Sequence, residues 1–374
     1  MGGAGVTFGV ENLPYGVFSL PGQSPRVGVR IGDDVLDLAA ALGDEVFAMP
    51  YLNPFMALGR TAWREARERV KEAAPTGGHR VPLDQVTLHL PIEVADYVDF
   101  YASLEHATNV GLMFRPGEEP LKPNWRHLPV GYHGRAGTVV VSGTPVRRPC
   151  GQRLVNGRPE FGPSLKLDVE AEMGFVVGVP TALGERAGAF EDHVFGVTLV
   201  NDWSARDIQS WEYVPLGPFL GKSFATSISP WITPLEALEE ARVDGPAQDP
   251  VPLPYLRRAA PWALDLTLAI EVDGEPVSAP PYREMYWTPD QMLAHLTVNG
   301  ASLRTGDLFA SGTVSGGGQR GSLLELTWNG AEPIKLSGGQ TRTFLEDGDI
   351  VTISAVTRGG LSLGEVSGQI LPAT

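Results

Sequence analysis

Acidic side chains recur at every second position between Leu165 and Met173, with apolar residues in between. The polar positions are Lys166, Asp168, Glu170 and Glu172. Because successive side chains of an extended strand point to opposite faces, these acids are expected to share one face. Carboxylates so close together repel one another unless a cation or water relieves them. A solvent-facing strand produces the same alternation, so a cation site and an ordinary exposed strand both remain open.

Asp202 adds a carboxylate at the end of another predicted strand, residues 194–200. Two glutamates and an aspartate at strand ends form an all-oxygen ligand set, which suits a hard cation such as Mg²⁺ or Ca²⁺. Zinc is less favoured, because these acids have no nearby histidine pair or cysteine pair.

A polar stripe follows Asp202 at helical spacing. Steps of four, three and four residues separate Asp202, Arg206, Gln209 and Tyr213. This is the period of one helical face, so the spacing predicts a helix over residues 202–213 that ends before Pro215. A solvated surface stripe is the more common use of such a pattern. Its place between two apolar stretches favours a site instead.

His106 is the strongest candidate for a general base, because imidazole titrates near neutral pH. It follows Ser103, a residue type that often caps the N-terminus of a helix, so a helix is expected over residues 103–113. A lone histidine is more often satisfied inside a core. The polar residues Asp99, Tyr101 and Arg115 nearby favour the functional interpretation.

The segment Gly217–Ser223 imitates a phosphate-binding loop but does not match it. Three residues separate its glycines where four are required, and Pro218 removes a backbone donor. We therefore reject a nucleotide site here.

The elements around these motifs are mostly strands. Short strands are expected at residues 16–20, 26–31 and 34–38, followed by a helix at 62–74 and a linker at 75–82, with a domain boundary near residues 75–92. Further strands are expected at residues 165–177, 194–200, 263–272, 323–328 and 350–355, and a helix at 288–298. This order favours a mainly β protein, with a small N-terminal unit and a larger sandwich or distorted barrel.

Composition excludes several classes of partner. The 374-residue chain has a net charge of −15, which argues against nucleic acid and anionic membranes. Its single cysteine, Cys150, allows no internal disulfide, and residues 1–6 lack a signal sequence. We therefore expect a cytoplasmic protein without membrane spans.

With these motifs assembled, the chain resembles the fumarylacetoacetase family over essentially its whole length. The resemblance rests on the strings Asp96–Tyr101, His106–Gly111, Pro123–Arg135, Leu167–Glu172, Asn201–Phe224 and Ala310–Gly316. It implies an SH3-like N-terminal β-barrel over residues 1–91 and a mixed β-sandwich roll over residues 92–374, in a homodimer. It also implies hydrolysis of 4-fumarylacetoacetate to fumarate and acetoacetate, the last step of tyrosine and phenylalanine breakdown.

The resemblance also implies a role for each candidate residue. The divalent cation, Ca²⁺ or Mg²⁺, would be held by Asp99, Glu170, Glu172 and Asp202. Lys222 and Thr226 match positions around a second cation, Mg²⁺, where an ammonium cannot be a ligand and the lysine backbone carbonyl would serve. His106 would activate water and be oriented by Glu325. Arg206, Gln209 and Lys222 would stabilise the oxyanion. The substrate would be held by Tyr101, Arg115, Tyr132, Gln209, Tyr213 and Thr313.

Two alternatives remain at this point. One is a related hydrolase or decarboxylase acting on acylpyruvates or other diketo acids. The other is a cation-dependent binding protein that uses the same acids and aromatic residues without catalysis.

Overall fold

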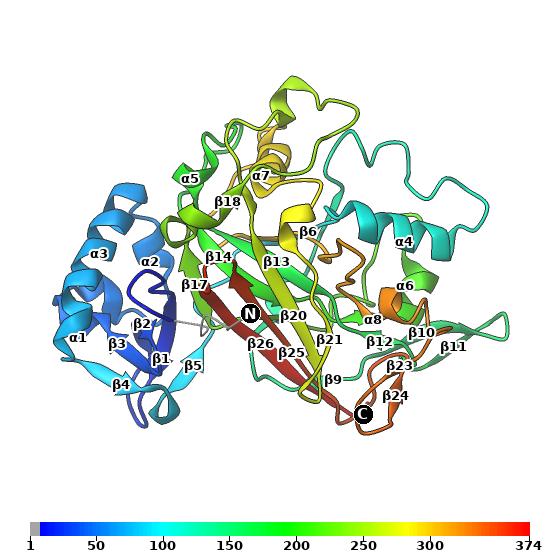
Figure 1. The fold of residues 1–374 in the computed structure, drawn as a ribbon, viewed down its shortest axis with the longest axis horizontal. Helices are drawn as coiled ribbons and strands as arrows, with labels where there is room; N and C mark the ends of the chain where they lie inside the picture. The colour runs from blue at the N-terminus through cyan, green and yellow to red at the C-terminus, as the bar shows by residue number, and fades with distance from the viewer. Residues whose placement is uncertain (1–7) are drawn as a thin grey trace.

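A computed structural model describes residues 8–374, and residues 1–6, on which we based the absence of a signal sequence, lie outside them. The fold is mainly β, as predicted (Figure 1). A unit rich in helices and short strands lies at one side of the molecule, and long strands of two larger sheets fill the centre. Among the described residues, no helix is long and apolar enough to cross a membrane.

The larger sheet has thirteen strands and joins both parts of the chain. Its main path runs in the order β4-β3-β2-β1-β17-β14-β13-β22-β6-β7. Those strands are β1 (Tyr15–Ser19), β2 (Arg26–Ile31), β3 (Asp34–Asp37), β4 (Arg80–Pro82), β6 (Tyr97–Phe100), β7 (Gly131–His133), β13 (Ala171–Val177), β14 (Val194–Asn201), β17 (Trp231–Pro234) and β22 (Leu308–Ala310). Off this path lie β5 (Thr87–His89), β8 (Val139–Val141) and β16 (Thr226–Ile228). The sheet is mixed, because β22 runs parallel to β6 and β16 parallel to β8.

A second sheet of five strands lies in the order β21-β20-β25-β26-β9. Its strands are β9 (Val146–Arg147), β20 (Leu266–Val272), β21 (Glu275–Ser278), β25 (Ile350–Thr357) and β26 (Ser362–Leu371). Two-stranded ladders complete the β structure: β10 (Cys150–Val155) with β11 (Arg158–Pro163), β12 (Leu167–Asp168) with β15 (Ser204–Ala205), β18 (Arg242–Val243) with β19 (Ala263–Leu264), and β23 (Ile334–Lys335) with β24 (Thr341–Arg342).

The α-helices are short. They are α1 (Leu38–Leu42), α2 (Asn53–Met56), α3 (Arg60–Ala73), α4 (Leu104–Phe114), α5 (Phe190–His193), α6 (Arg206–Glu212), α7 (Pro289–Thr297) and α8 (Leu323–Leu326). The expected helices at 62–74, 103–113 and 288–298 are therefore present as α3, α4 and α7. Ser103 caps α4 as predicted, because its side chain accepts a hydrogen bond from the backbone of His106.

The central strands are buried on both faces. In β13, Met173, Phe175 and Val177 belong to one hydrophobic cluster, while Val176 belongs to a second cluster shared with the N-terminal unit. A strand with two buried faces places its acidic positions in the interior, away from solvent. The exposed-strand interpretation of the acidic alternation is therefore wrong.

The N-terminal unit is continuous with the rest of the fold. Strand β1 pairs with β17, so the strands β4 to β1 extend the large sheet, and the pairings among residues 8–374 close no barrel. The division at residues 91 and 92 stays a prediction.

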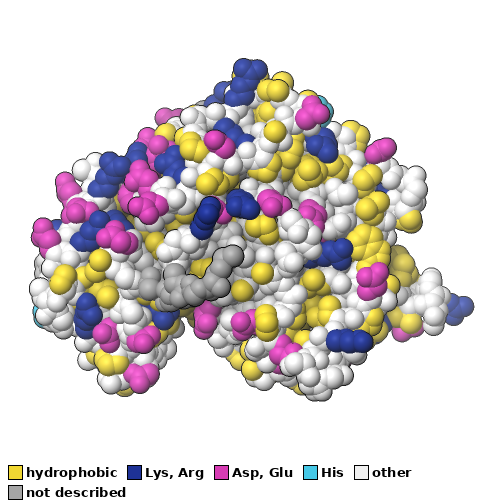
Figure 2. All heavy atoms as spheres, viewed as in Figure 1, with side chains coloured by type: hydrophobic (Ala, Val, Ile, Leu, Met, Phe, Trp, Pro, Cys, Tyr) yellow, Lys and Arg dark blue, Asp and Glu magenta, His cyan; other side chains and the backbone are white. Residues whose placement is uncertain are grey.

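Charged side chains of both signs are interspersed on the face in Figure 2, where the helical N-terminal unit lies at the left.

Several expected elements differ. The predicted strand at 165–177 is divided into β12 and β13, and the one at 263–272 into β19 and β20. The predicted helix at 202–213 begins only at Arg206, because Ser204 pairs with Asp168 in the β12–β15 ladder and keeps the preceding residues extended. The predicted strand at 323–328 is instead the helix α8, capped by Ser322, whose side chain accepts a hydrogen bond from the backbone of Glu325.

Candidate active site

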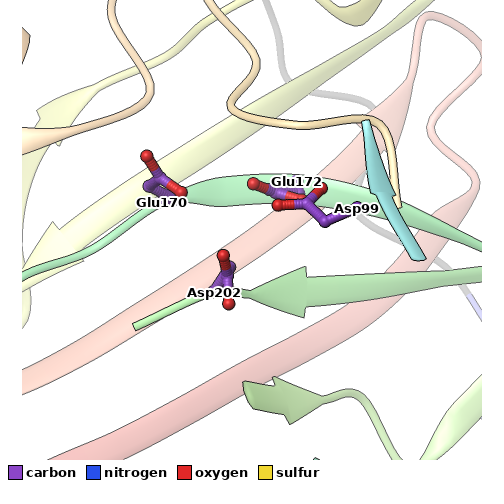
Figure 3. Close-up of side chains that lie close together, drawn as sticks. All are labelled: Asp99, Glu170, Glu172 and Asp202. Atoms are coloured by element: carbon purple, nitrogen blue, oxygen red, sulfur yellow. The ribbon is translucent and has the colours of Figure 1, made fainter. Parts of the chain in front are cut away.

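Four acidic side chains converge where neighbouring strands of the large sheet end. Asp99 lies in β6, Glu172 in β13, Glu170 just before β13, and Asp202 just after β14. Because β6, β22, β13 and β14 are neighbours in that order, the sheet itself brings these positions together. One carboxylate oxygen from each residue lies within 4.8 Å of the others, and the side chains point toward one another (Figure 3).

The cluster is buried and short of positive charge. All four acids are at most 4% exposed, and both carboxylate oxygens of Glu172 lack a hydrogen-bond partner in the described part of the chain. Burial raises the pKa of Glu172 and of Asp99 well above the ordinary value, and the neighbouring carboxylates raise both further. Unpartnered buried carboxylate oxygens in an all-oxygen set fit a hard divalent cation. The cluster is therefore a candidate metal site.

Two buried cations offset part of this negative charge. Lys222 Nζ donates to Asp202 Oδ2 at 2.7 Å and also to Glu170. Arg206 Nη2 lies 2.6 Å from Glu170 Oε1. Although burial alone would raise the pKa of Glu170, Arg206 and Lys222 hold it below its ordinary value. Glu170 is therefore anionic, while Glu172 and Asp99 are the groups that a bound cation would relieve.

A histidine and a glutamate form a hydrogen-bonded pair beside the acids. His106 Nδ1 lies 2.6 Å from Glu325 Oε2, and His106 Nε2 lies 4.0 Å from Glu170 Oε1. Burial raises the pKa of Glu325, but its interaction with His106 and the hydrogen bonds from Asn109 and Ser315 outweigh this and lower that pKa overall. An anionic acceptor at Nδ1 assigns the imidazole proton to Nδ1. This leaves Nε2 free to take a proton.

Three further side chains fix the Glu325 carboxylate. Ser315 Oγ and Ser322 Oγ each donate to Oε2 at 2.9 Å, and Asn109 Nδ2 donates to Oε1 at 2.9 Å. None of the three was singled out from the sequence. For Asn109 the signal was available, because it lies three residues after His106 and shares its helical face.

Asp168 contacts both the helix that carries Glu325 and the arginine beside Glu170. It is fully buried, and it accepts hydrogen bonds from the backbone of Leu323 and Leu324 at 2.8 and 3.0 Å. Its Oδ2 also accepts a hydrogen bond from Arg206 Nε at 2.8 Å. One carboxylate thus holds the first turn of α8, which carries Glu325, and the guanidinium that faces Glu170. The acidic alternation included Asp168, but the sequence assigned it no role.

A cavity of about 460 Å³ opens over the acids and the His106–Glu325 pair. Twelve predicted residues line it: Asp99, Tyr101, His106, Arg115, Tyr132, Glu170, Glu172, Arg206, Gln209, Tyr213, Lys222 and Thr313. Asp202 and Thr226 instead line an adjoining cavity of about 130 Å³, which Lys222 also reaches. Glu325 lines neither cavity and lies behind His106.

The residues expected to hold a substrate differ in the contacts that they already make within the protein. Tyr132 donates to Asp202 Oδ2 at 2.9 Å, and the Tyr101 ring packs edge-on against His106 with centroids 5.2 Å apart. The Thr313 hydroxyl is buried without a partner among the described residues. Its unused hydrogen-bonding capacity is what a polar ligand would satisfy.

The remaining candidates lie on the wall and at the mouth of the cavity. Arg115 Nη2 donates to the Pro120 carbonyl at 2.7 Å. Gln209 Oε1 accepts from Arg206 Nη1 at 3.3 Å. Tyr213 is 38% exposed at the end of α6. The four polar residues that the sequence placed on one helix therefore do not share it. Asp202 lies before the helix, Arg206 and Gln209 lie in it, and Tyr213 directly follows it.

The loop that imitates a phosphate site is occupied by protein. The backbone N–H groups of Phe219 and Gly221 both donate to Glu212 Oε1, at 2.8 and 2.7 Å. An internal carboxylate thus takes the donors that a phosphate would need, which agrees with our rejection of a nucleotide there.

Comparisons with known proteins match both parts of the chain. Residues 96–370 match the family model of the fumarylacetoacetate hydrolase C-terminal region, and residues 11–91 match that of the fumarylacetoacetase N-terminal region. The fumarylacetoacetases of Homo sapiens and Caenorhabditis elegans are each 48% identical, and that of Arabidopsis thaliana is 46% identical. Each alignment covers 98% of this chain and 96 or 97% of the relative.

Solved structures share the fold at low identity. A fumarylacetoacetate hydrolase from Exiguobacterium antarcticum superimposes with a TM-score of 0.59 at 18% identity, covering 96% of this chain and 99% of its own. A maleylpyruvate hydrolase from Sphingobium gives a TM-score of 0.56 at 18% identity, covering 96% of this chain and 100% of its own.

Proposed function

The chain belongs to the fumarylacetoacetate hydrolase family, and on this premise we propose that it hydrolyses a carbon–carbon bond of 4-fumarylacetoacetate. The products are fumarate and acetoacetate. The observation that carries the proposal is that one cavity is lined by both a buried acidic cluster and the histidine of a His–Glu pair. A cation site alone would serve binding, whereas a histidine held by a carboxylate supplies a general base.

His106 is the proton-transfer group. Its Nε2 takes a proton from water, and the anionic Glu325 stabilises the imidazolium that forms. The hydroxyl adds to the carbonyl carbon next to the fumaroyl double bond. When the neighbouring carbon–carbon bond breaks, its electron pair passes to the acetoacetate fragment. That carbon then receives a proton and becomes the methyl group of acetoacetate.

The acidic cluster fits the electrostatic needs of this reaction. We propose that Asp99, Glu170, Glu172 and Asp202 hold Ca²⁺ or Mg²⁺ and that a second Mg²⁺ lies by Lys222 and Thr226. A hard cation supplies polarisation of the diketone carbonyls and stabilisation of enolate charge. Arg206, Gln209 and Lys222 supply donors for the developing oxyanion.

The substrate carries two carboxylates, and the proposed binding residues suit them. Arg115 lines the cavity, its Nη2 donates to a backbone carbonyl, and its Nε has no hydrogen-bond partner among the described residues. We assign it, with Tyr101, Tyr132 and Tyr213, to binding of the diacid chain, and Thr313 to a polar contact. We further propose a cytoplasmic homodimer that serves tyrosine and phenylalanine breakdown.

A substrate panel tests the function. The absorbance of fumarylacetoacetate is followed with purified protein, with and without a chelator, beside an acylpyruvate as competing substrate. We expect acetoacetate release that the chelator abolishes and added Mg²⁺ or Ca²⁺ restores. Turnover of the acylpyruvate alone would favour the related diketo-acid hydrolases. Saturable binding without turnover of either compound would favour a binding protein.

A further inference from the structure

We propose that Asn109 is a positioning residue for the general base, an inference that rests on the proposed function of His106. The Asn109 side chain does not line the cavity, so it has no contact with a substrate there. Instead its amide donates to Glu325 Oε1 at 2.9 Å. Its effect on the reaction therefore passes through Glu325 to His106.

The helix α4 holds both oxygens of the same carboxylate. His106 and Asn109 lie three residues apart on this helix, a spacing that places two side chains on one face. His106 Nδ1 meets Oε2, and Asn109 Nδ2 meets Oε1. Contacts to both oxygens fix the orientation of the carboxylate plane, whereas the donors to Oε2 alone fix only the position of that oxygen.

The donors around Glu325 are unevenly divided between its two oxygens. Oε2 accepts from His106, Ser315 and Ser322. Oε1 accepts from Asn109 alone among the described residues. Because Glu325 is fully buried, loss of the Asn109 amide removes the one donor to Oε1 among the described residues. The carboxylate then turns to share the donors of Oε2, which draws that oxygen away from His106 Nδ1.

The Asn109 side chain must donate a hydrogen bond, and a side chain of similar size without a donor would not replace it. An aspartate at position 109 would face Glu325 with a second carboxylate at hydrogen-bond distance, and two such groups share a proton. The shared proton removes negative charge from the partner of His106. A leucine fills the same space without donating. Both substitutions thus preserve volume and remove the contact in different ways.

The test compares Asn109→Leu and Asn109→Asp with Thr108→Val. Thr108 lies on the same helix, and its hydroxyl donates to the Leu104 carbonyl at 2.7 Å, so its substitution controls for disturbance of α4. We expect kcat for fumarylacetoacetate to fall about ten- to hundredfold in both Asn109 variants, with KM changed less than about twofold. Thr108→Val should keep kcat within about twofold. Asn109→Ser provides the same comparison if the leucine variant does not fold.

A second readout needs no substrate. The proton of His106 Nδ1–H in a short bond to Glu325 gives a strongly deshielded NMR resonance, which we expect in the wild type and in Thr108→Val. Its loss or upfield shift in Asn109→Leu supports the positioning role even if fumarylacetoacetate is not cleaved, an outcome that refutes the proposed function alone. An unchanged resonance together with unchanged kcat in Asn109→Leu overturns the inference.

Discussion

Glu325 Oε2 lies 2.6 Å from His106 Nδ1, although 219 positions separate the two residues in the chain. The contact forms because α4 and α8 present their first turns to each other, each capped by a serine. Glu325 is therefore fixed by its helix and by four side-chain donors before any substrate arrives. Such preorganisation is what a general base needs.

Replacing Glu325 with glutamine should disable the base without removing the site. The amide oxygen still accepts from Nδ1, but the negative charge that stabilises the imidazolium is gone. We expect kcat to fall about 10²- to 10⁴-fold, with cation affinity measured by calorimetry nearly unchanged. A variant with wild-type kcat would show that His106 does not work through Glu325.

Thr313→Val should weaken substrate binding without lowering the stability of the fold. Because the Thr313 hydroxyl has no hydrogen-bond partner within residues 8–374, its removal breaks no hydrogen bond there, and thermal stability should be unchanged or slightly higher. If the hydroxyl binds substrate, KM should rise about fivefold, which corresponds to about 1 kcal/mol. An unchanged KM together with unchanged stability would remove Thr313 from the substrate contacts.

Asp168→Asn should weaken the fold and the site together. The substitution leaves the buried guanidinium of Arg206 without one of its two carboxylates and weakens the cap on α8. Removing one partner of a buried ion pair typically costs about 3–5 kcal/mol. We expect a loss of about that size in urea denaturation, accompanied by lower kcat. Arg342 forms an ion pair with the buried Asp349, and neither residue lines the cavities of the site, so Arg342→Gln should destabilise the protein with kcat unchanged.

Local patterns in the sequence predicted much of the site. The alternation from Lys166 to Glu172 marked Glu170 and Glu172 as site residues, although the predicted strand is divided into β12 and β13 and Asp168 lies outside the cluster. Ser103 marked the start of the helix that carries His106. Those predictions depend on residues a few positions apart, where the chain has few choices. The family resemblance then supplied the pairing of His106 with Glu325, which no local spacing indicates.

The failures have tertiary causes. The residues from Asp202 to Ala205 match a helical period, but the β12–β15 ladder holds Ser204 opposite Asp168. Residues Leu323–Leu326 have the apolar composition of a strand, yet Asp168 accepts the N–H groups at the start of this segment and stabilises a helical turn. In both places one buried residue, distant in sequence, outweighs local propensity.

The stability of the chelator-treated protein should fall as pH rises toward neutrality. Asp99 and Glu172 have raised pKa values in the folded state, so the folded protein holds protons that the unfolded chain has released. Stability then declines with rising pH between the ordinary and the folded pKa, by up to about 1.4 kcal/mol per pH unit for each group. The pKa of Glu325 is lowered in the folded state, so its effect has the opposite sign. The stability that Glu325 contributes is lost only as the pH falls below about 4.3.

Thermal melts between pH 5 and pH 8 check this dependence, with the chelator and with saturating Ca²⁺. We expect the decline toward pH 8 only in the chelator-treated sample, because a bound cation replaces the protons. Identical profiles in the two samples would contradict a cation site at Asp99 and Glu172.

Cation binding should release protons, and Glu172 should account for part of the release. A cation displaces protons from acids whose pKa is raised, so binding should acidify a weakly buffered solution. An indicator dye during titration with Mg²⁺ or Ca²⁺ measures the number of protons released. Glu172→Gln should release fewer protons and bind the cation more weakly, because an amide carries no displaceable proton and no charge. Glu346→Gln, at a side chain that is 65% exposed, should match the wild type in both respects. Equal release from wild type and Glu172→Gln would show that Glu172 is already ionised in the metal-free protein, and that its two unpartnered oxygens are satisfied in some other way.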